Sequence, residues 1–374
     1  MFKKIMITIS ILIFLGTTLF FYLYILKNNN NSNPNNLLSN FSKYSNDTIH
    51  SLEEIDLEGC SYNGWLSTKN GVIVNQKNKT FQLRGVSSHS LDWFYNVITF
   101  ENLKYLKETW NINVFRIAMY TDIAEKGYIK SPNETKEKVY TIIDAAINLD
   151  MYVIVDWHIL NDNSPQIYKK EAIEFFSEIS QKYGNKPNII YEICNEPNGS
   201  NVKWDSDVKP YAEELIPVIR KNCNKSLIIV GTPEWCTDLT SVINSPLKYD
   251  NVLYSCHFYS GTHGSDLRYK ILDCLTSNIP IIISECGVTA ASGNGDVFFD
   301  SFNEWIKFLN SHNISWIYWS FSDKAESSSI ISSNYQNIDE KNSLSNFESN
   351  SKNIDNYLTN SGSFIKNIFQ NYNK

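Results

Sequence analysis

The sequence predicts an α/β fold, and specifically a (β/α)8 TIM barrel with a short N-terminal β-hairpin. Three observations carry this prediction: short apolar runs recur along the chain, helical patterns separate them, and polar side chains follow where the runs end. The 374 residues suffice for one large α/β domain with additional terminal segments. A doubly wound open sheet is the alternative, although the first strand is not followed by a glycine-rich phosphate loop.

The composition favours a neutral ligand over a charged polymer. The net charge of −7 opposes binding to a polyanion such as a nucleic acid. The chain also holds 22 Tyr, 20 Phe and 9 Trp. Most of these rings will fill the core, and the remainder are suited to stacking on a neutral ligand.

The N-terminal segment, residues 1–27, is expected to be a membrane anchor or a signal segment. Lys3 and Lys4 precede an apolar run from Ile5 to Leu26, which is about the 20 residues that a spanning helix needs. The run lacks an Ala-x-Ala cleavage pattern, which favours an uncleaved anchor over a cleaved signal. We expect the remainder of the chain at the extracellular face of the cell membrane, or secreted if the segment is removed.

Residues 28–60 are rich in Asn, with Ser and Pro, and predict a linker that cannot bury enough apolar surface to fold. The folded domain is therefore assigned to residues 61–374. It should open with a hairpin between Gly71–Val74 and Thr80–Leu83, because these two runs flank a polar turn.

Eight further apolar runs are candidate barrel strands. They are Phe81–Val86, Ile112–Met119, Tyr152–Trp157, Asn188–Cys194, Ser226–Gly231, Val252–His257, Pro280–Glu285 and Ser315–Trp319. Apolar residues at helical spacing predict helices over Asn133–Leu149, Gln166–Tyr183, Ser206–Lys221, Gly264–Ser277 and Phe298–Ser311. The Ser- and Asn-rich stretch Ile330–Ile354 predicts a loop, and a last helix should begin near Leu358–Gly362.

The fourth candidate strand is the one around which the prediction is built. It is apolar on both faces, as a strand in a covered parallel sheet must be, and it runs directly into Asn195, Glu196 and Pro197. Pro197 ends the strand because it has no N–H for the ladder. Glu196 is thereby held at the carboxyl end of a rigid strand, where barrels carry their chemistry.

Polar and aromatic side chains follow most of the other strands too. They include His89, Trp93, Arg116, Tyr120, His158, His257, Tyr259, Glu285 and Trp319. Each alone could be a satisfied core residue, but buried charges are costly unless they are paired or functional. Together they predict one cleft that contains two carboxylates, an arginine, histidines and flat rings.

Two facing carboxyl groups can hydrolyse a glycosidic bond without a cofactor. One must be protonated to give its proton to the leaving oxygen, while the other must be ionised to attack the anomeric carbon or activate water. Arg116 would keep one carboxylate ionised by Coulomb attraction. Trp and Tyr rings would stack on the apolar faces of the sugar.

Seven motifs, in order, resemble glycoside hydrolase family 5 cellulases, most closely the bacterial endo-β-1,4-glucanase subfamily. They are Ser87–His89, Arg116–Thr121, Asp156–Leu160, Tyr191–Asn198, His257–Gly264, Ser284–Gly287 and Trp319–Lys324. The resemblance runs from about Gly64 to the C-terminus. It implies a (β/α)8 barrel that hydrolyses β-1,4-glucan with retention of configuration, by a double-displacement mechanism. The implied cleavage is endo-acting, at internal bonds of the polysaccharide.

The same resemblance implies roles for individual residues. Glu196 would be the acid/base and Glu285 the nucleophile, with Asn195 on the sugar 2-hydroxyl. The expected supporting residues are Arg116 and Tyr259 at the nucleophile, His89, Tyr120, His158 and His257 around the reacting sugar, Trp93 and Trp319 as stacking platforms, and Lys324 and Glu326 at a more distant glucose. A non-proline cis peptide is expected at Trp319–Ser320.

Two positions depart from the pattern of the family. Cys286 stands where the family usually has Trp, and Ser90 stands where it usually has Gly. Neither change removes a catalytic group, but the first leaves a large volume to be refilled beside Glu285.

No cofactor or metal is expected, because none of the seven cysteines shows a metal-ligand spacing. The disulfide pattern cannot be read from the sequence. The expected partner is a β-glucan polysaccharide or oligosaccharide, bound by a monomer that meets the membrane only through its N-terminal helix. A hydrolase acting on mannan, xyloglucan or mixed-linkage glucan is the first alternative. A non-catalytic glycan-binding barrel is the second.

Overall fold

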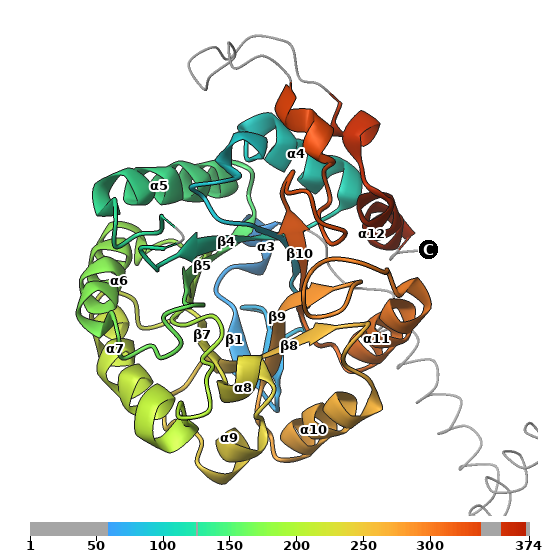
Figure 1. Ribbon diagram of the computed structural model, residues 1–374. Coiled ribbons are helices and arrows are strands. Elements are labelled where there is room, and N and C mark those ends of the chain that lie inside the picture. Colours follow the sequence, from blue (N-terminus) through green and yellow to red (C-terminus); the bar gives the residue numbers. More distant parts are fainter. Residues whose placement is uncertain (1–58, 125, 338–352, 372–374) are drawn as a thin grey trace, which may run out of the picture. The chain divides into compact units, whose positions relative to one another are not determined.

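The computed structural model describes residues 59–124, 126–337 and 353–371. Eight parallel strands close into a barrel in the order β10-β3-β4-β5-β6-β7-β8-β9, and helices surround it (Figure 1). The predicted (β/α)8 barrel is therefore confirmed. The barrel closes where β10 (Trp316–Phe321) pairs with β3 (Arg84–Ser88), so the last strand lies beside the first.

Each of the eight predicted barrel strands is present, with its ends shifted by a few residues. Between β3 and β10 lie β4 (Val114–Tyr120), β5 (Tyr152–His158), β6 (Ile189–Glu192), β7 (Ile228–Gly231), β8 (Val252–Tyr259) and β9 (Ile281–Gly287). Every residue of these strands is buried. The continuous apolar runs in the sequence follow from that burial on both faces.

The predicted helices are also present. The long ones are α4 (Phe100–Trp110), α5 (Pro132–Asn148), α6 (Lys169–Tyr183), α7 (Lys209–Asn222), α10 (Ser265–Thr276), α11 (Phe299–Ser311) and α12 (Asn360–Asn371). The hydroxyl of Thr99 caps α4 by accepting from the Asn102 backbone N–H at 3.1 Å. Between β7 and β8 the connection holds only the short helices α8 (Pro233–Cys236) and α9 (Thr240–Asn244).

The N-terminal hairpin exists, but its strands differ from the predicted pair. A short helix, α3 (Cys60–Asn63), leads into β1 (Ser67–Lys69), which pairs antiparallel with β2 (Val72–Val74). The predicted partner after the Asn/Gln/Lys turn makes only a single bridge, Val74 to Thr80. The chain must leave that pairing early because the residues after Phe81 enter the barrel.

The hairpin region packs against the amino-terminal end of the barrel. Tyr152, at the start of β5, donates its hydroxyl proton to the Gly64 carbonyl at 2.7 Å. Leu66, Ile73 and Phe81 join a buried apolar cluster that includes side chains of the barrel strands. This end of the barrel is thus plugged by apolar packing, and the opposite end is available for the site.

In the described part of the chain, no helix is long and apolar enough to cross a membrane. The predicted anchor in residues 1–27 and all but the last two residues of the predicted linker lie outside the described residues, as do residues 338–352 of the predicted loop. The described part of that loop contains a 3-10 turn at Ser333–Asn337, and α12 begins where the last helix was expected.

Candidate active site

The site is built around Arg116, an inward-facing residue of β4 that has no exposed surface. Its guanidinium contacts three carboxylates: Nε to Glu192 Oε2 at 2.7 Å, Nη2 to Asp156 Oδ2 at 2.9 Å and Nη1 to Glu285 Oε2 at 3.2 Å. A single cation therefore neutralises part of a buried acidic cluster. The charge of this cluster is the reason why Arg116 remains protonated in spite of its burial.

Glu285 lies near the carboxyl end of β9 and has two hydrogen-bond donors. Arg116 donates to Oε2, and the Tyr259 hydroxyl donates to Oε1 at 2.7 Å. Burial, and then the charges of Glu285 and Glu196, raise the pKa of Tyr259 well above its ordinary value, so the phenol keeps its proton. Both donors bind the ionised form of Glu285.

Glu196 follows β6 and faces a different partner. Its Oε1 lies 2.7 Å from Nδ1 of His257, which is on β8. Gly231, at the end of β7, allows the backbone to pass closely here, since a Cβ at that position would lie 2.2 Å from the Asn195 carbonyl oxygen. One carboxylate oxygen of Glu196, one of Glu285 and a nitrogen of His257 all lie within 4.8 Å of one another.

Burial is the main reason why the pKa of each of the two carboxyls is raised to about 7. The negative charge of Glu196 is a second cause of the raised pKa of Glu285. Because the two N–H and O–H donors point at Glu285, the ionised member of the pair is Glu285 and the proton resides on Glu196. Arg116 acts in the expected direction on Glu285, although burial outweighs it.

Asn195 and His158 complete the floor of the site. The Asn195 side-chain oxygen accepts from Arg116 Nη2 at 2.7 Å, and its nitrogen donates to the Ile159 carbonyl at 3.1 Å. The same nitrogen lies 3.3 Å from His158 Nε2, which must then accept. Nδ1 of His158 therefore carries its proton and donates to Asp156 at 2.6 Å.

Four rings form one wall of the site. Tyr120 stacks on His158 with centroids 4.3 Å apart, and Trp319 lies 5.3 Å from the same histidine at 10° between planes. His89 packs against both Tyr120 and Trp319. The peptide Trp319–Ser320 is cis, as predicted. Tyr120, His158 and Trp319 lie on β4, β5 and β10, and His89 directly follows β3, so the strand order brings the four rings together.

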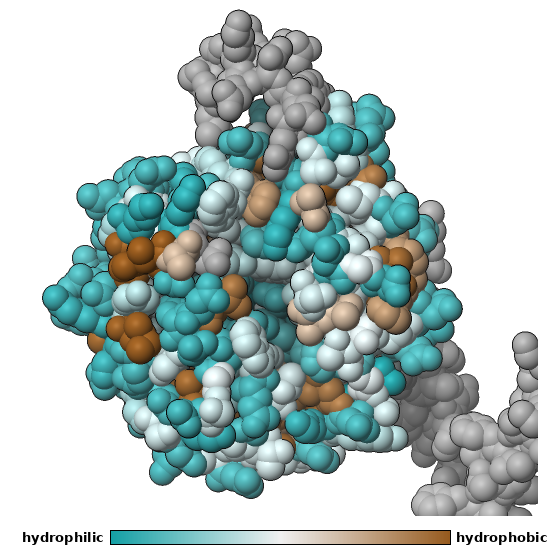
Figure 2. Space-filling model, viewed as in Figure 1, coloured by the Kyte–Doolittle hydropathy of each residue, from teal (hydrophilic) through white to brown (hydrophobic). Residues whose placement is uncertain are grey.

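The remaining predicted residues lie nearer the rim. Lys324 is 2.7 Å from Glu326 and 3.2 Å from His89 Nε2, so the two residues expected at a distant glucose are adjacent to the ring wall. Trp93, in the turn after β3, is 49% exposed, and the Lys126 ammonium lies 4.0 Å from its ring centroid. In Figure 2 a hollow with a hydrophilic floor lies near the middle of the face shown.

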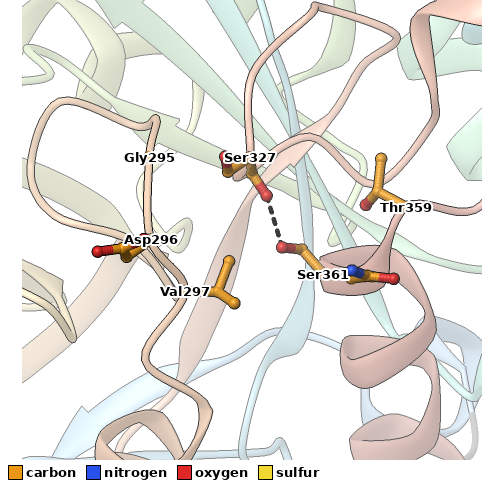
Figure 3. Close-up of a pocket in the computed structure, with 7 residues that line it drawn as sticks. Gly295, Asp296, Val297, Ser327, Thr359 and Ser361 are labelled. Carbon is orange, nitrogen blue, oxygen red and sulfur yellow. Dashed lines mark hydrogen bonds between the residues drawn. The ribbon is translucent and has the colours of Figure 1, made fainter.

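A second pocket is lined by other residues, one of which directly follows Glu326 in the chain (Figure 3). Its walls are Gly295–Val297, Ser327 and Thr359–Ser361, and the Ser361 hydroxyl donates across it to the Ser327 carbonyl. Its lining contains none of the predicted site residues. The pocket therefore has no part in the arrangement around Arg116.

Sequence reasoning missed several residues of the site. Glu192, Asp156 and Ser284 are fully buried beside Arg116 and His257. Asp156 and Glu192 stand two residues beyond the apolar Ile154 and Ile190, and a carboxylate inside a mostly apolar strand could have identified them. Trp235 in α8 was not singled out either: it is 49% exposed, adopts a left-handed conformation (φ 58°), and its backbone N–H donates to the carbonyl of Pro197, the residue after Glu196, at 3.2 Å.

The two departures from the family pattern are accommodated by packing. Cys286 is fully buried within the apolar cluster between strands and helices, beside Tyr318 on β10. It does not belong to the group around Arg116, so its smaller size is a matter of core volume. Ser90 is buried, and its backbone N–H donates to Nδ1 of His89 at 2.7 Å.

All seven cysteines are buried and unpaired. Among the described residues, the only set of His, Cys, Asp and Glu side chains close enough to hold an ion is Glu196, His257 and Glu285. These side chains already bond to each other or to Arg116 and Tyr259. That the protein needs no metal remains a prediction.

The family model described as "Cellulase (glycosyl hydrolase family 5)" matches residues 74–325. An endoglucanase of Clostridium saccharobutylicum is 45% identical over 273 residues (73% of this chain, 60% of the relative), and Endoglucanase A of Evansella cellulosilytica is 50% identical over 250 residues (67% and 51%). The chain thus spans between half and two thirds of the length of these two relatives.

Among solved structures, the catalytic domain of a Thermobifida fusca endoglucanase in complex with cellotetraose aligns with a TM-score of 0.74 at 29% identity. The alignment covers 83% of this chain and 99% of that one.

Proposed function

The chain belongs to glycosyl hydrolase family 5, the cellulase family, and from that membership we propose that it hydrolyses β-1,4-glucosidic bonds within cellulose or a related β-glucan. The cleavage is endo-acting and retains the anomeric configuration. Glu285 is the nucleophile and Glu196 is the acid/base. The observation that carries the proposal is the pair of facing carboxyls, within 4.8 Å by their nearest ligand atoms, at the ends of β6 and β9.

The short separation supports retention. Retaining enzymes hold their carboxyl groups about 5–5.5 Å apart, whereas inverting enzymes need about 6.5–9.5 Å to admit a water molecule. In the first step Glu285 bonds to the anomeric carbon as the glycosidic bond breaks, and Glu196 gives its proton to the leaving oxygen. In the second step Glu196 takes a proton from water, the water oxygen bonds to the same carbon, and the bond to Glu285 breaks.

The neighbouring residues support these roles. Arg116 and Tyr259 hold Glu285 ionised and oriented for attack. Asn195 is fixed by Arg116 and His158, so its amide can meet the sugar 2-hydroxyl in the transition state. The wall of Tyr120, His158 and Trp319 is suited to the apolar face of a glucose ring. Lys324 and Glu326 present a charged pair to hydroxyls further along the chain of sugars.

Substrate class is tested by reducing-sugar release. Soluble cellulose should be cleaved, with a rapid fall in viscosity because an endo-acting enzyme cuts internal bonds. Mannan, xyloglucan and mixed-linkage glucan serve as parallel substrates. Preference for one of them would reassign the substrate, and no release from any of them by the full chain would favour the glycan-binding alternative. A fresh product with inverted configuration, observed by NMR, would contradict the retaining mechanism.

We further propose that the barrel acts outside the cell, attached through residues 5–26 as a single-pass anchor and spaced by residues 28–60. The support is the length of the apolar run and the linker composition. Fractionation of cells decides the matter: activity should sediment with membranes. Activity wholly in the medium, on chains that lack residues 1–30, would mean that the segment is a cleaved signal.

A further inference from the structure

A line of hydrogen bonds runs beneath the two facing carboxyls. Glu196 Oε1 lies 2.7 Å from His257 Nδ1, His257 Nε2 lies 2.9 Å from Ser284 Oγ, and Ser284 Oγ lies 2.6 Å from Glu192 Oε1. Each of these side chains is buried. The line therefore links Glu196 to Glu192, a carboxylate that the mechanism above does not use.

The protonation of Glu192 decides which atom donates in each hydrogen bond of this line. Arg116 donates to both oxygens of Glu192, Nε to Oε2 at 2.7 Å and Nη2 to Oε1 at 3.3 Å. Arg116 is a cation that donates to both oxygens, and these two charge-assisted hydrogen bonds favour the carboxylate form of Glu192 against burial, which raises its pKa. Glu192 can then only accept, and the single hydroxyl proton of Ser284 must point at it.

Ser284 in turn decides which nitrogen of His257 carries the proton. Having donated its proton, Ser284 Oγ accepts from its other neighbours, His257 Nε2 and the Ser255 hydroxyl at 2.5 Å. Neutral His257 must therefore carry its proton on Nε2. Its Nδ1 presents a lone pair to Glu196, and a short contact to that lone pair requires a proton on Glu196.

We propose that Ser284, oriented by Glu192, is a positioning residue that holds His257 in the Nε2–H tautomer and thereby keeps Glu196 protonated for its role as general acid. This inference rests on the proposed function. Ser284 does not touch the sugar in this scheme. It acts through His257, and its effect should be confined to steps that need the proton of Glu196.

The charges around His257 agree with a neutral ring. Arg116 on β4 opposes a second proton on the ring, and Glu192 and Glu285 favour one. Burial outweighs all three and lowers the pKa of His257 to about 4. His158 on β5 is also neutral, since burial and Arg116 lower its pKa. The proton between Glu196 and His257 therefore belongs to Glu196 in the resting enzyme.

The tautomer can be observed directly in the unaltered protein. With ¹⁵N-histidine labelling, the imidazole signals of His257, assigned by comparison with His257→Gln, should show a proton on Nε2 and a bare, hydrogen-bonded Nδ1 between pH 5 and 7. A proton on Nδ1 with a bare Nε2, or a doubly protonated ring, would overturn the proposal. This measurement does not depend on activity.

The catalytic consequence can be measured with two kinds of substrate. In Ser284→Ala the Nε2–H loses its acceptor, so the Nδ1–H tautomer becomes competitive and stabilises ionised Glu196. Hydrolysis of cellotetraose should fall about 10- to 100-fold, a part of what a general acid contributes. Hydrolysis of 2,4-dinitrophenyl β-cellobioside, whose leaving group needs no proton, should change less than about threefold. The basic limb of kcat/KM on cellotetraose should move to lower pH.

Matched variants separate this role from packing. Ser284→Thr retains the hydroxyl and should behave as the parent on both substrates. Ser180→Ala removes another fully buried serine hydroxyl, on α6 away from the site, and should leave both rates unchanged. An equal loss on both substrates in Ser284→Ala, or no loss on either, contradicts the proposal. If the parent enzyme cleaves neither substrate, the proposed function fails, and the tautomer measurement still tests the hydrogen-bond line.

Discussion

The interior of the barrel changes from apolar to mostly polar over two residues along five of its strands, β5, β6, β8, β9 and β10. Near the amino-terminal end the inward positions are apolar: Ile154, Ile190, Leu253, Ile282 and Ile317 form one buried cluster. Two residues further along, the same strands carry Asp156, Glu192, Ser255, Ser284 and Trp319, and Glu196 and Glu285 lie just beyond Glu192 and Ser284. We call these the apolar layer and the polar layer. Both layers are buried, but they contribute differently to stability and to activity.

The apolar layer stabilises the fold by removing hydrocarbon from water. The polar layer gains nothing of that kind: it buries carboxylates, whose pKa values are raised as a result. Such groups are retained because they do chemistry. The comparison predicts that substitutions in the polar layer should remove activity and spare stability, and that substitutions in the apolar layer should do the reverse.

The largest effect on activity is expected from Glu285→Gly. Loss of the proposed nucleophile should lower turnover by about 10⁴-fold or more, because both steps of the proposed mechanism pass through the bond that Glu285 forms. Added azide should restore a product of inverted configuration. The unfolding midpoint should not fall, since a buried carboxyl has been removed. A variant that is both inactive and much less stable would break the distinction between the layers.

Glu196→Ala should show the next largest effect. Cleavage of cellulose should fall about 10²- to 10⁴-fold because the proposed general acid is missing. A substrate with an activated leaving group should still form the glycosyl-enzyme, and azide should convert it to the retained β-glycosyl azide. If Glu196→Ala and Glu285→Gly give exchanged azide products, the roles of the two residues are swapped.

Leu253→Ala tests the apolar layer. The side chain has no exposed surface, so truncation should lower the free energy of unfolding by about 2–5 kcal/mol. The value of kcat on soluble cellulose, normalised to folded protein, should remain that of the parent. Urea unfolding followed by circular dichroism measures the first quantity. A loss of kcat with unchanged stability would show that the layers are not separable here.

The pH dependence of stability sharpens the comparison. Burial raises the pKa of Asp156 to about 7, so the folded chain binds this proton more tightly than the unfolded chain. The stabilisation is complete below the unfolded pKa near 4 and is lost as the pH rises through 7. The unfolding free energy of the parent minus that of Asp156→Asn should therefore fall between pH 4 and 7, by at most about 1.4 kcal/mol per unit. A difference that rises with pH would contradict this sign.

The smallest effect is expected from Trp93→Ala, outside both layers. The exposed ring should contribute about 1 kcal/mol to oligosaccharide binding, seen as roughly fivefold weaker affinity for short cello-oligosaccharides. The unfolding midpoint should not change. Tyr269→Ala, which removes an exposed aromatic from α10, is the control for both measurements. If the Trp93 variant unfolds more easily while its folded fraction binds oligosaccharides as tightly as the parent, the ring serves packing and not sugar binding.

The two layers were unequally predictable from the sequence. Apolar runs defined all eight barrel strands, since burial on both faces leaves a signal in every residue. Residues such as Glu196 and Glu285 were predictable because they end those runs. Glu192 and Ser284 were not predictable, because the role of a single polar residue inside a strand depends on partners from other strands. Here those partners are Arg116 and His257. The strands of the hairpin were mispaired for a related reason: three-residue strands carry too little pattern.

The closure between β10 and β3 has a consequence for how the protein is made. These strands lie more than 200 residues apart in the chain, and α12 then covers α4, with Gln370 bonded to the Thr109 carbonyl. During translation, the backbone edges of β3 and β9 that pair with β10 remain unpaired until β10 has left the ribosome. A chain stopped before Trp316 would thus expose two strand edges and expand or associate with other chains. β10 would therefore have to be synthesised before the barrel, and with it the site around Arg116, could close.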